Sequence, residues 1–237
     1  MMLQELRLLL DWVEADAPAS GYVAAIMDDN VLGKPTRSTR QRTATHLIEL
    51  YALDPHCTLF RLLRHFWAVD AAGQPMLAFL VACARDPLLC TATPFLFTVP
   101  LGQTMAPAAI AVHLHALYPS RFWPSTLIAT AKRLASTWAQ AGYLQGKQTK
   151  RRLHPQITPV VTAFALLLGY LCSRRGARLV ESTWTQLLDC PANELSERIV
   201  AASTQEWLRY KAAGTVVEIT FPELLTPAEE QTADESH

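Results

Sequence analysis

The sequence predicts a mainly α-helical protein with a few short strands. Apolar residues recur three and four positions apart along most of its 237 residues, which is the spacing of one helix face. Fifteen prolines interrupt this pattern and divide it into many short helices. One segment differs, because a long helical pattern there ends at a glycine and leads into a short stretch rich in lysine and arginine. A helix followed by a basic hairpin predicts a winged helix-turn-helix-like unit.

The composition divides the chain into three predicted regions. Residues 1–72 form an N-terminal helical region with a basic cluster, residues 73–225 hold the winged-helix-like unit and the C-terminal helices, and residues 226–237 form an acidic tail that we expect to be disordered. Charged residues break up the first fifteen positions, so no signal peptide is expected. The longest apolar run, residues 160–172, is too short to span a bilayer. We therefore expect a cytoplasmic protein with no membrane partner.

The first region begins with two predicted helices, residues 3–15 and 22–31. A stretch without acidic residues follows, in which Ser38 or Thr39 is expected to cap a helix that runs through Tyr51. Three arginines lie at or near the start of this helix: Arg37, Arg40 and Arg42. Positive charge is unfavourable at that end of the helix dipole, and a bound anion would relieve the cost. The cluster is either a phosphate contact or a solvated basic turn.

Four further segments lead to the winged unit. Residues 58–69 and 76–85 are predicted helices, the second of them buried on most sides. Residues 88–100 are expected to be either extended or a short helix between prolines. Residues 107–118, with Thr104 as the expected cap, form the first helix of the helix-turn-helix.

The second helix of that unit is predicted from Pro124 to Gly142, since proline suits a first helical turn and glycine a C-terminal cap. In helix-turn-helix proteins the second helix enters the major groove of DNA. Its apolar stripe faces the core, so we predict DNA contacts from polar residues outside that stripe. These are Thr130, Lys132, Arg133 and Thr137.

A short hairpin after Gly142 supplies the predicted wing, which turns at Gly146. Its four cations are Lys147, Lys150, Arg151 and Arg152. Lysine and arginine on a wing would bind DNA phosphates and release counterions. The alternative is a surface helix beside an ordinary hairpin. The charge pattern favours the wing, because ten basic and no acidic residues lie between Asp86 and Glu181 in a chain with 21 of each overall.

The C-terminal part is predicted to contain three helices. The first covers residues 160–172 with Thr158 at its start, the second covers 179–188, and a longer one covers 194–211. Residues 215–221 alternate as expected of a strand.

The search for an active site finds no recognisable motif. The sequence has no phosphate-binding glycine loop, no dinucleotide-binding turn and no zinc-protease histidine pair. Its five cysteines are scattered and its seven histidines dispersed, which argues against a disulfide framework and a structural zinc site. We therefore expect no catalytic residue, no metal and no cofactor.

Two stretches carry a resemblance to a known family. They are Gly33-Lys34-x-x-Arg37-Ser38-Thr39-x-x-Arg42 and Leu134-x-x-x-Trp138-x-x-x-Gly142-x-Leu144. On these motifs, roughly residues 20–225 resemble the BrxA family, small proteins of BREX bacteriophage-defence systems. The resemblance implies a partly winged helical fold, similar in part to the NusB antitermination factor, that binds double-stranded DNA without cleaving it. It also implies partners among other BREX proteins, namely a methyltransferase, a phosphatase-like protein and an ATPase.

The sequence therefore predicts a non-catalytic protein that binds double-stranded DNA, mainly through phosphates, as an accessory component of a BREX phage-defence system. The second helix carries no long array of arginine, asparagine or glutamine for base contacts, which indicates low sequence specificity. Two alternatives stay open. One is a scaffold whose basic face docks an acidic protein partner, and the other is a NusB-like protein that binds RNA.

Overall fold

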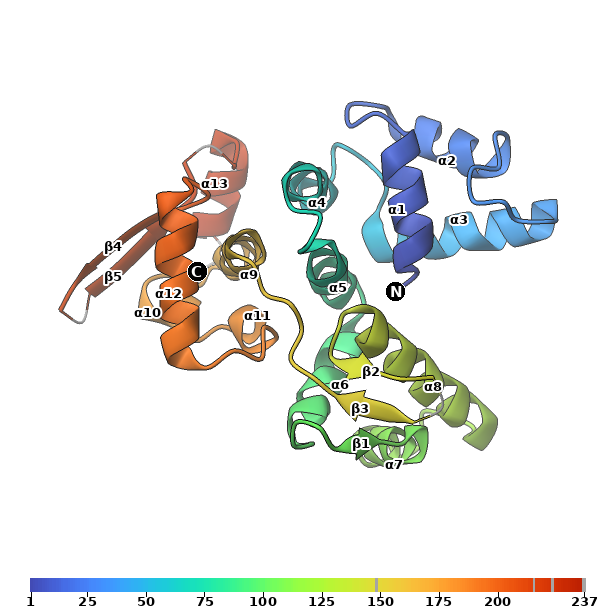
Figure 1. Ribbon diagram of the computed structural model, residues 1–237. Coiled ribbons are helices and arrows are strands. Elements are labelled where there is room, and N and C mark those ends of the chain that lie inside the picture. Colours follow the sequence, from blue (N-terminus) through green and yellow to red (C-terminus); the bar gives the residue numbers. More distant parts are fainter. Residues whose placement is uncertain (148, 215, 223, 236–237) are drawn as a thin grey trace.

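A computed structural model describes the chain except for residues 148, 215, 223 and 236–237, together with the side chains of 232, 234 and 235. It confirms a mainly helical fold with a few short antiparallel strands in two small sheets. Three lobes surround a central group of helices (Figure 1). The N-terminal lobe consists of α1 (Leu3–Trp12), α2 (Ala19–Met27) and α3 (Arg37–Tyr51).

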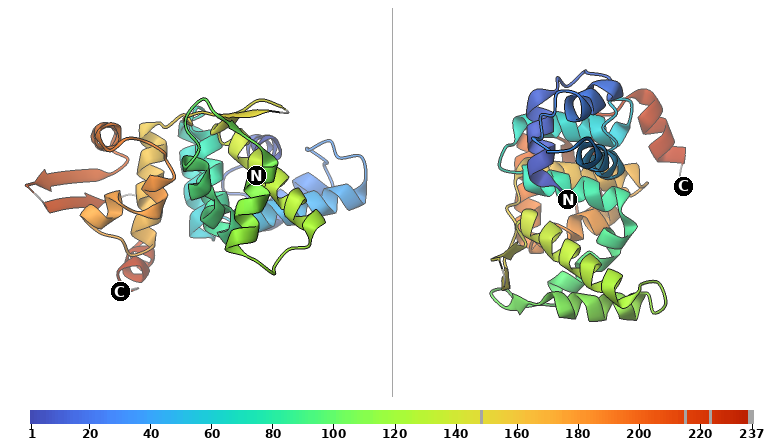
Figure 2. Two further views of the ribbon diagram at one scale, coloured as in Figure 1. Left: turned by 90° about the horizontal axis from the view of Figure 1, so that it is seen from below. Right: turned by 90° about the vertical axis from the view of Figure 1, so that its right-hand side faces the viewer.

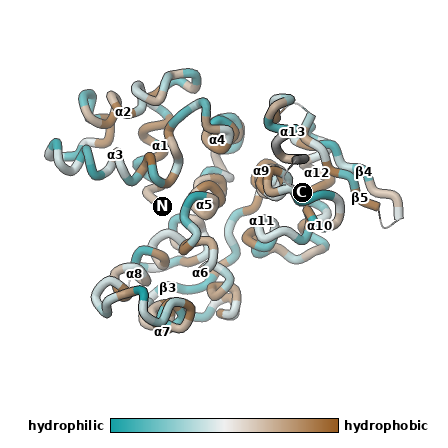
Figure 3. Tube along the Cα trace, turned by 180° about the vertical axis from the view of Figure 1, so that it is seen from behind, coloured by the Kyte–Doolittle hydropathy of each residue, from teal (hydrophilic) through white to brown (hydrophobic). Residues whose placement is uncertain are grey.

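The central helices are α4 (Thr58–Val69), α5 (Gln74–Arg85) and α9 (Pro159–Leu171). Figure 3 shows apolar residues concentrated on them, where the lobes meet. Helix α9 is the apolar run of the sequence, and each of its residues from Val160 to Tyr170 is buried. Because α9 is buried on all sides, the apolar residues of the three lobes form one continuous core, which extends from Leu3 to Ala233. Among the described residues, no helix is both long enough and apolar enough to cross a membrane.

The winged unit extends from residue 87 to residue 158. Its elements are α6 (Pro87–Phe97), β1 (Thr104–Met105), α7 (Pro107–Leu117), α8 (Pro124–Gln140), β2 (Leu144–Gln145) and β3 (Lys150–Arg152). The three strands form an antiparallel sheet in the order β1-β3-β2. A helix, a turn, a second helix and a hairpin therefore follow one another as predicted.

The C-terminal lobe consists of α10 (Ala177–Val180), α11 (Thr183–Gln186), α12 (Ala192–Thr204), β4 (Arg209–Ala213), β5 (Val216–Thr220) and α13 (Pro227–Glu235). Strands β4 and β5 form a separate antiparallel hairpin. This hairpin projects from the molecule on the side opposite to α3 (Figure 2).

Two expected helices and the expected tail differ from the structure in the C-terminal lobe. The helix expected over 194–211 ends at Thr204, because residues 209–213 pair with β5 instead. The helix expected over 179–188 is two short helices, since Ser182 caps a new one through the backbone N–H of Thr185. The expected disordered tail forms α13 over residues 227–235, whose Glu229 pairs with Arg61 at 2.6 Å. The end of that expected tail, residues 236–237, lies outside the described residues.

Hydrogen bonds also decide three questions about helix caps and helix starts between residues 36 and 105. Thr36, rather than Ser38 or Thr39, caps α3 by accepting from the backbone N–H of Thr39. Asp86 caps α6 through two backbone N–H groups, so residues 87–97 are helical. Thr104 caps no helix, because it lies in β1 opposite Arg151.

Candidate nucleic-acid interface

Helix α8 is fixed by the apolar stripe that predicted it. Ala131, Leu134 and Trp138 are buried against the rest of the winged unit. The indole N–H of Trp138 donates to the hydroxyl of Thr93 on α6 at 3.1 Å, which satisfies its one buried polar atom. These contacts fix the rotation of α8 about its own axis, so they determine which side chains face the N-terminal lobe and which face solvent.

The second side of α8 faces the N-terminal lobe, and this overturns two predicted DNA contacts. Thr130 and Thr137 are only 5% and 7% exposed. The backbone nitrogen of Met1 donates to the Thr137 hydroxyl at 3.0 Å, and the N–H of Leu3 donates to the Gln140 amide oxygen at 2.9 Å. Thr137 and Gln140 therefore join α8 to the N-terminal lobe, and burial makes both Thr130 and Thr137 unavailable to a duplex.

The third side of α8 is open to solvent. Lys132 and Arg133 are exposed, as predicted, and Arg133 also donates to the Thr130 hydroxyl at 3.3 Å. Helical spacing places Ser125, Ala129, Lys132 and Ser136 on one face, with Ile128, which is 51% exposed, one turn before Lys132. The exposed part of α8 therefore presents two cations among small residues and one large apolar side chain.

The wing presents two of its four predicted cations fully to solvent. Lys147 and Arg151 are exposed, whereas Lys150 is half-buried and donates to the carbonyl oxygen of Gly146 at 3.3 Å. Gly146 has a φ of 117°, and a Cβ there would collide with the Thr149 carbonyl oxygen, so the turn requires glycine. The predicted turn position is therefore confirmed.

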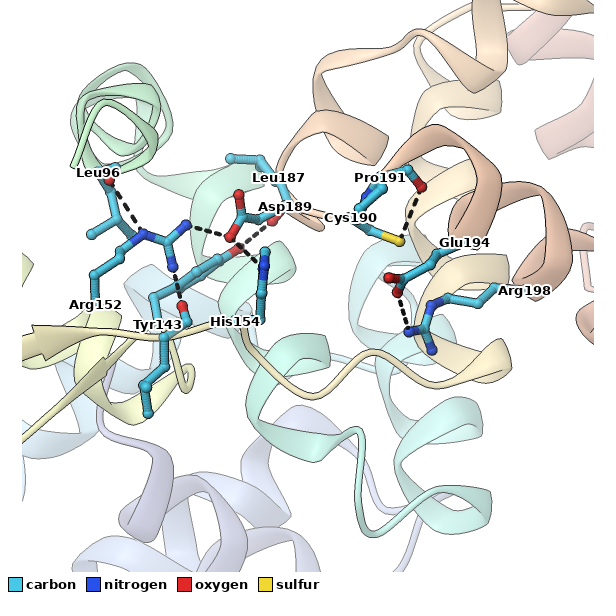
Figure 4. A network of polar contacts seen from close by, with 11 residues as sticks. Leu96, Tyr143, Arg152, His154, Leu187, Asp189, Cys190, Pro191, Glu194 and Arg198 are labelled. Atoms are coloured by element: carbon cyan, nitrogen blue, oxygen red, sulfur yellow. Dashed lines mark hydrogen bonds and ion pairs between the residues drawn. The ribbon is translucent and has the colours of Figure 1, made fainter. Parts of the chain in front are cut away.

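Arg152, the fourth predicted wing cation, points the other way and is wrong as a DNA contact. Side chains alternate across a strand, so Arg152 faces inward while Arg151 faces outward. Its side chain is 2% exposed and forms an ion pair with Asp189 of the C-terminal lobe, shown in Figure 4. Its guanidinium also donates to the carbonyl oxygens of Leu96 and Leu153. A buried arginine satisfied in this way supports the fold.

Two neighbours complete the junction between the winged unit and the C-terminal lobe. The hydroxyl of Tyr143 donates to the carbonyl oxygen of Leu187, and burial raises the pKa of this phenol well above its usual value. His154 lies 3.0 Å from the same Asp189 carboxylate (Figure 4). The junction sets the direction in which the wing and α8 face.

The α3 cluster lies at the start of its helix, as predicted. Arg37 and Arg42 are exposed, and Arg40 is half-buried with an Nε that has no hydrogen-bond partner. In the described residues, no carboxylate forms an ion pair with any of the three.

A groove of about 1020 Å³ separates the N-terminal lobe from α8. Its polar lining includes the side chains of His46, Arg85 and Arg133 as well as the carboxylates of Glu5, Glu49 and Asp86. The first turns of α3 and α8 both point to the right-hand side of Figure 1. Of the predicted cations on these two helices, Arg133 lines the groove and Arg37, Arg42 and Lys132 do not.

Most cations of the winged unit lack a carboxylate partner among the described residues, as do Arg37, Arg40 and Arg42 of α3. Elsewhere Lys34, Arg61 and Arg198 pair with glutamates at 2.6–3.1 Å. Within the described part of the chain, six cations of the winged unit form no ion pair with a carboxylate: Arg121, Lys132, Arg133, Lys147, Lys150 and Arg151. Their positive field is not cancelled locally.

Three residues of this region were not predicted as site residues. Arg121 and Trp123 reach solvent in the turn between α7 and α8. The absence of acidic residues around Arg121 could have predicted it as a phosphate contact. Nothing in the sequence identifies Asp189 as the partner of Arg152, because 37 positions separate them. The described residues contain no cluster of three or more His, Cys, Asp or Glu that could hold a metal ion.

Comparison of the chain with protein-family models finds no match, and comparisons with curated proteins and with solved structures find none either. The resemblance to the BrxA family stays a prediction, and any proposal about function depends on the geometry described above.

Proposed function

We propose that the protein binds double-stranded DNA through the winged unit, mainly by contacts to phosphates and without cleaving it. The observation that carries the proposal is the set of six cations without carboxylate partners on a helix-turn-helix and its wing. Phosphate contacts supply most of the affinity of such surfaces because bound cations displace condensed counterions.

The geometry of α8 supports this binding mode. Lys132 and Arg133 extend from the exposed part of α8, the helix that enters a DNA groove in helix-turn-helix proteins. Lys147 and Arg151 project from the wing, where they would contact the backbone beside that groove. The exposed polar residues of α8 include no asparagine, so base reading is expected to be weak.

The α3 cluster supplies a second phosphate contact in this proposal. Arg37 and Arg42 pair with no carboxylate of the described part of the chain, and they lie at the positive end of a helix dipole, where an anion is favoured. A duplex that contacts the first turns of both α3 and α8 would neutralise charge on the two helices.

The experiment is fluorescence anisotropy of a labelled 30-base-pair duplex titrated with protein across a salt series. We expect micromolar or tighter binding at low salt, with affinity falling steeply and linearly on a log–log plot. A structured RNA competitor tests the NusB-like alternative, and an acidic protein competitor tests the scaffold alternative. Absence of duplex binding at low salt would contradict the proposal.

The family resemblance extends the proposal to a biological role. On that resemblance, the protein acts in the cytoplasm as an accessory component of a BREX phage-defence system. Its partners there would be a methyltransferase, a phosphatase-like protein or an ATPase. Co-purification of the full chain with each candidate, before and after nuclease treatment, separates direct protein contacts from contacts through DNA.

A further inference from the structure

Trp123 is the most exposed large apolar side chain among the described residues, at 81%. A tryptophan ring is a large apolar surface that proteins normally bury. Four of the other five tryptophans are buried or half-buried, and Trp12 on α1 is 65% exposed. The sequence allows Trp123 to plug the turn between α7 and α8, but its exposure excludes that role.

A packed turn holds the ring in its exposed position. Phe122 packs edge-on against Tyr118 at 6.3 Å between ring centroids, and the Arg121 guanidinium lies 5.0 Å from the centre of the Tyr118 ring. Trp123 is the N-cap residue of α8, and Pro124 at the next position restricts it to an extended backbone. The indole therefore projects into solvent from a turn that these aromatic and cation–π contacts stabilise.

The surroundings of Trp123 indicate the chemistry of its partner. The solvent-exposed residues beside it in the sequence are polar, basic or small: Ser120, Arg121, Pro124 and Ser125. Lys132 and Arg133 follow on the same helix, and no carboxylate occurs between residues 86 and 181. An exposed aromatic ring among cations without acids matches a nucleobase attached to phosphates. Other exposed apolar residues of α7 and α8 include Leu117 and Ile128, at 39% and 51%, but cations without acidic residues around the ring favour a nucleobase over an apolar protein surface.

We infer that Trp123 stacks on a DNA base that has lost its own stacking partner, so that the protein prefers duplexes interrupted by unpaired bases. This inference rests on the proposed function and adds the class of DNA structure that is bound. A base in a continuous duplex has both faces covered, whereas a bulged base offers a free face. Stacking on aromatic side chains is worth about 1–3 kcal/mol per base, which corresponds to a preference of roughly 5- to 150-fold.

The test compares two labelled 30-base-pair probes, one fully paired and one with a central bulge of two unpaired bases. Wild-type protein is expected to bind the bulged probe at least about fivefold more tightly. Trp123→Ala should abolish this preference while changing affinity for the paired probe by less than about twofold. Trp123→Phe should keep part of the preference, since phenylalanine retains a stacking face. Trp12→Ala, which removes the other strongly exposed indole, is the matched control and should behave as wild type.

A fluorescence readout distinguishes stacking from a merely structural role. Binding of the bulged probe should quench tryptophan emission in the wild type and in Trp12→Ala, but less in Trp123→Ala. Failure to bind either probe would overturn the proposed function as well as this inference. Salt-dependent binding of the paired probe without a preference for the bulge, or a preference that survives Trp123→Ala, would overturn the inference alone.

Discussion

The β2–β3 wing and the β4–β5 hairpin both carry cations, but only the β4–β5 hairpin also carries a carboxylate. The β4–β5 hairpin carries Arg209 and Lys211, and the Lys211 ammonium lies 3.8 Å from the Glu218 carboxylate on the facing strand. The β2–β3 wing has no acidic residue, and among the described residues neither Lys147 nor Arg151 forms an ion pair. This difference in local charge is the reason why the wing, and not the β4–β5 hairpin, is the candidate DNA contact.

The hairpins also differ in how they join the body of the protein. The wing directs one arginine inward, and Arg152 joins it to the C-terminal lobe through the buried pair with Asp189. The inward contacts of β4–β5 are apolar, with Ile219 3% exposed. In the wing, neighbouring arginines have two roles: Arg152 stabilises the fold, and Arg151 belongs to the predicted DNA-binding surface.

The largest expected effect is a difference in stability between variants of two adjacent arginines of the wing. Arg152→Ala leaves the Asp189 carboxylate without its buried partner, which should lower the free energy of unfolding by about 3–5 kcal/mol. Arg151→Ala removes an exposed cation and should change it by less than about 0.5 kcal/mol. Chemical denaturation of both variants measures the difference.

A double variant serves as the control for this prediction. Arg152→Met with Asp189→Leu removes both charges, so it should recover much of the lost stability. Equal stability of the Arg151 and Arg152 single variants would contradict the inward and outward assignment of the wing residues.

The next effect compares two sides of α8. Lys132→Ala with Arg133→Ala should weaken duplex binding and reduce the log–log salt slope by about two. Thr137→Val removes the hydroxyl that accepts from Met1, so it should lower stability by about 1 kcal/mol and leave DNA affinity unchanged. Anisotropy titrations and thermal unfolding of the same preparations measure both quantities. A Thr137 variant with a reduced salt slope would show that the wrong side of α8 has been assigned to DNA.

The smallest effect concerns α13, which covers part of the C-terminal lobe. Burial alone would raise the pKa of Glu229, but hydrogen bonds from Arg61 and Thr226 outweigh it and lower the pKa to about 2. An unfolded glutamate titrates near 4.3. The ion pair therefore stabilises the docked helix fully above about pH 4.3, and this stabilisation is lost as the pH falls towards 2.

Hydrogen exchange measures this prediction. Amides of α13 should lose protection as the pH falls through this window, after correction for the intrinsic exchange rate, and Arg61→Ala should reproduce the loss at pH 7. The expected destabilisation is at most about 1 kcal/mol, since Arg61 is partly exposed. Amides of α12 provide the internal control. Unchanged α13 protection in Arg61→Ala would show that the ion pair does not hold this helix.

Local rules predicted much of the fold correctly. Pro124 and the apolar stripe through Trp138 gave the bounds of α8 almost to the residue, and Thr158 caps α9 as expected. Long-range pairing was not predictable in this way. Residues 209–211 continue a helical pattern in the sequence, but tertiary pairing with residues 218–220 makes them a strand.

The candidate site shows the same difference between residues that local periodicity predicts and residues whose burial depends on distant segments. The exposure of Lys132 and Arg151 followed from helix and strand periodicity. The burial of Thr130, Thr137 and Arg152 did not, because it depends on other segments folding against them. Their partners, Met1 and Asp189, lie 136 and 37 positions away from Thr137 and Arg152, respectively.

The most direct test of the central claim neutralises each hairpin in turn. The wing variant is Lys147→Ala with Arg151→Ala, and its matched control is Arg209→Ala with Lys211→Ala, which removes the same charge from the other hairpin. Duplex binding across a salt series should show a slope reduced by about two in the wing variant and a wild-type slope in the control. Equal slopes in the two variants would contradict the assignment of DNA binding to the winged unit.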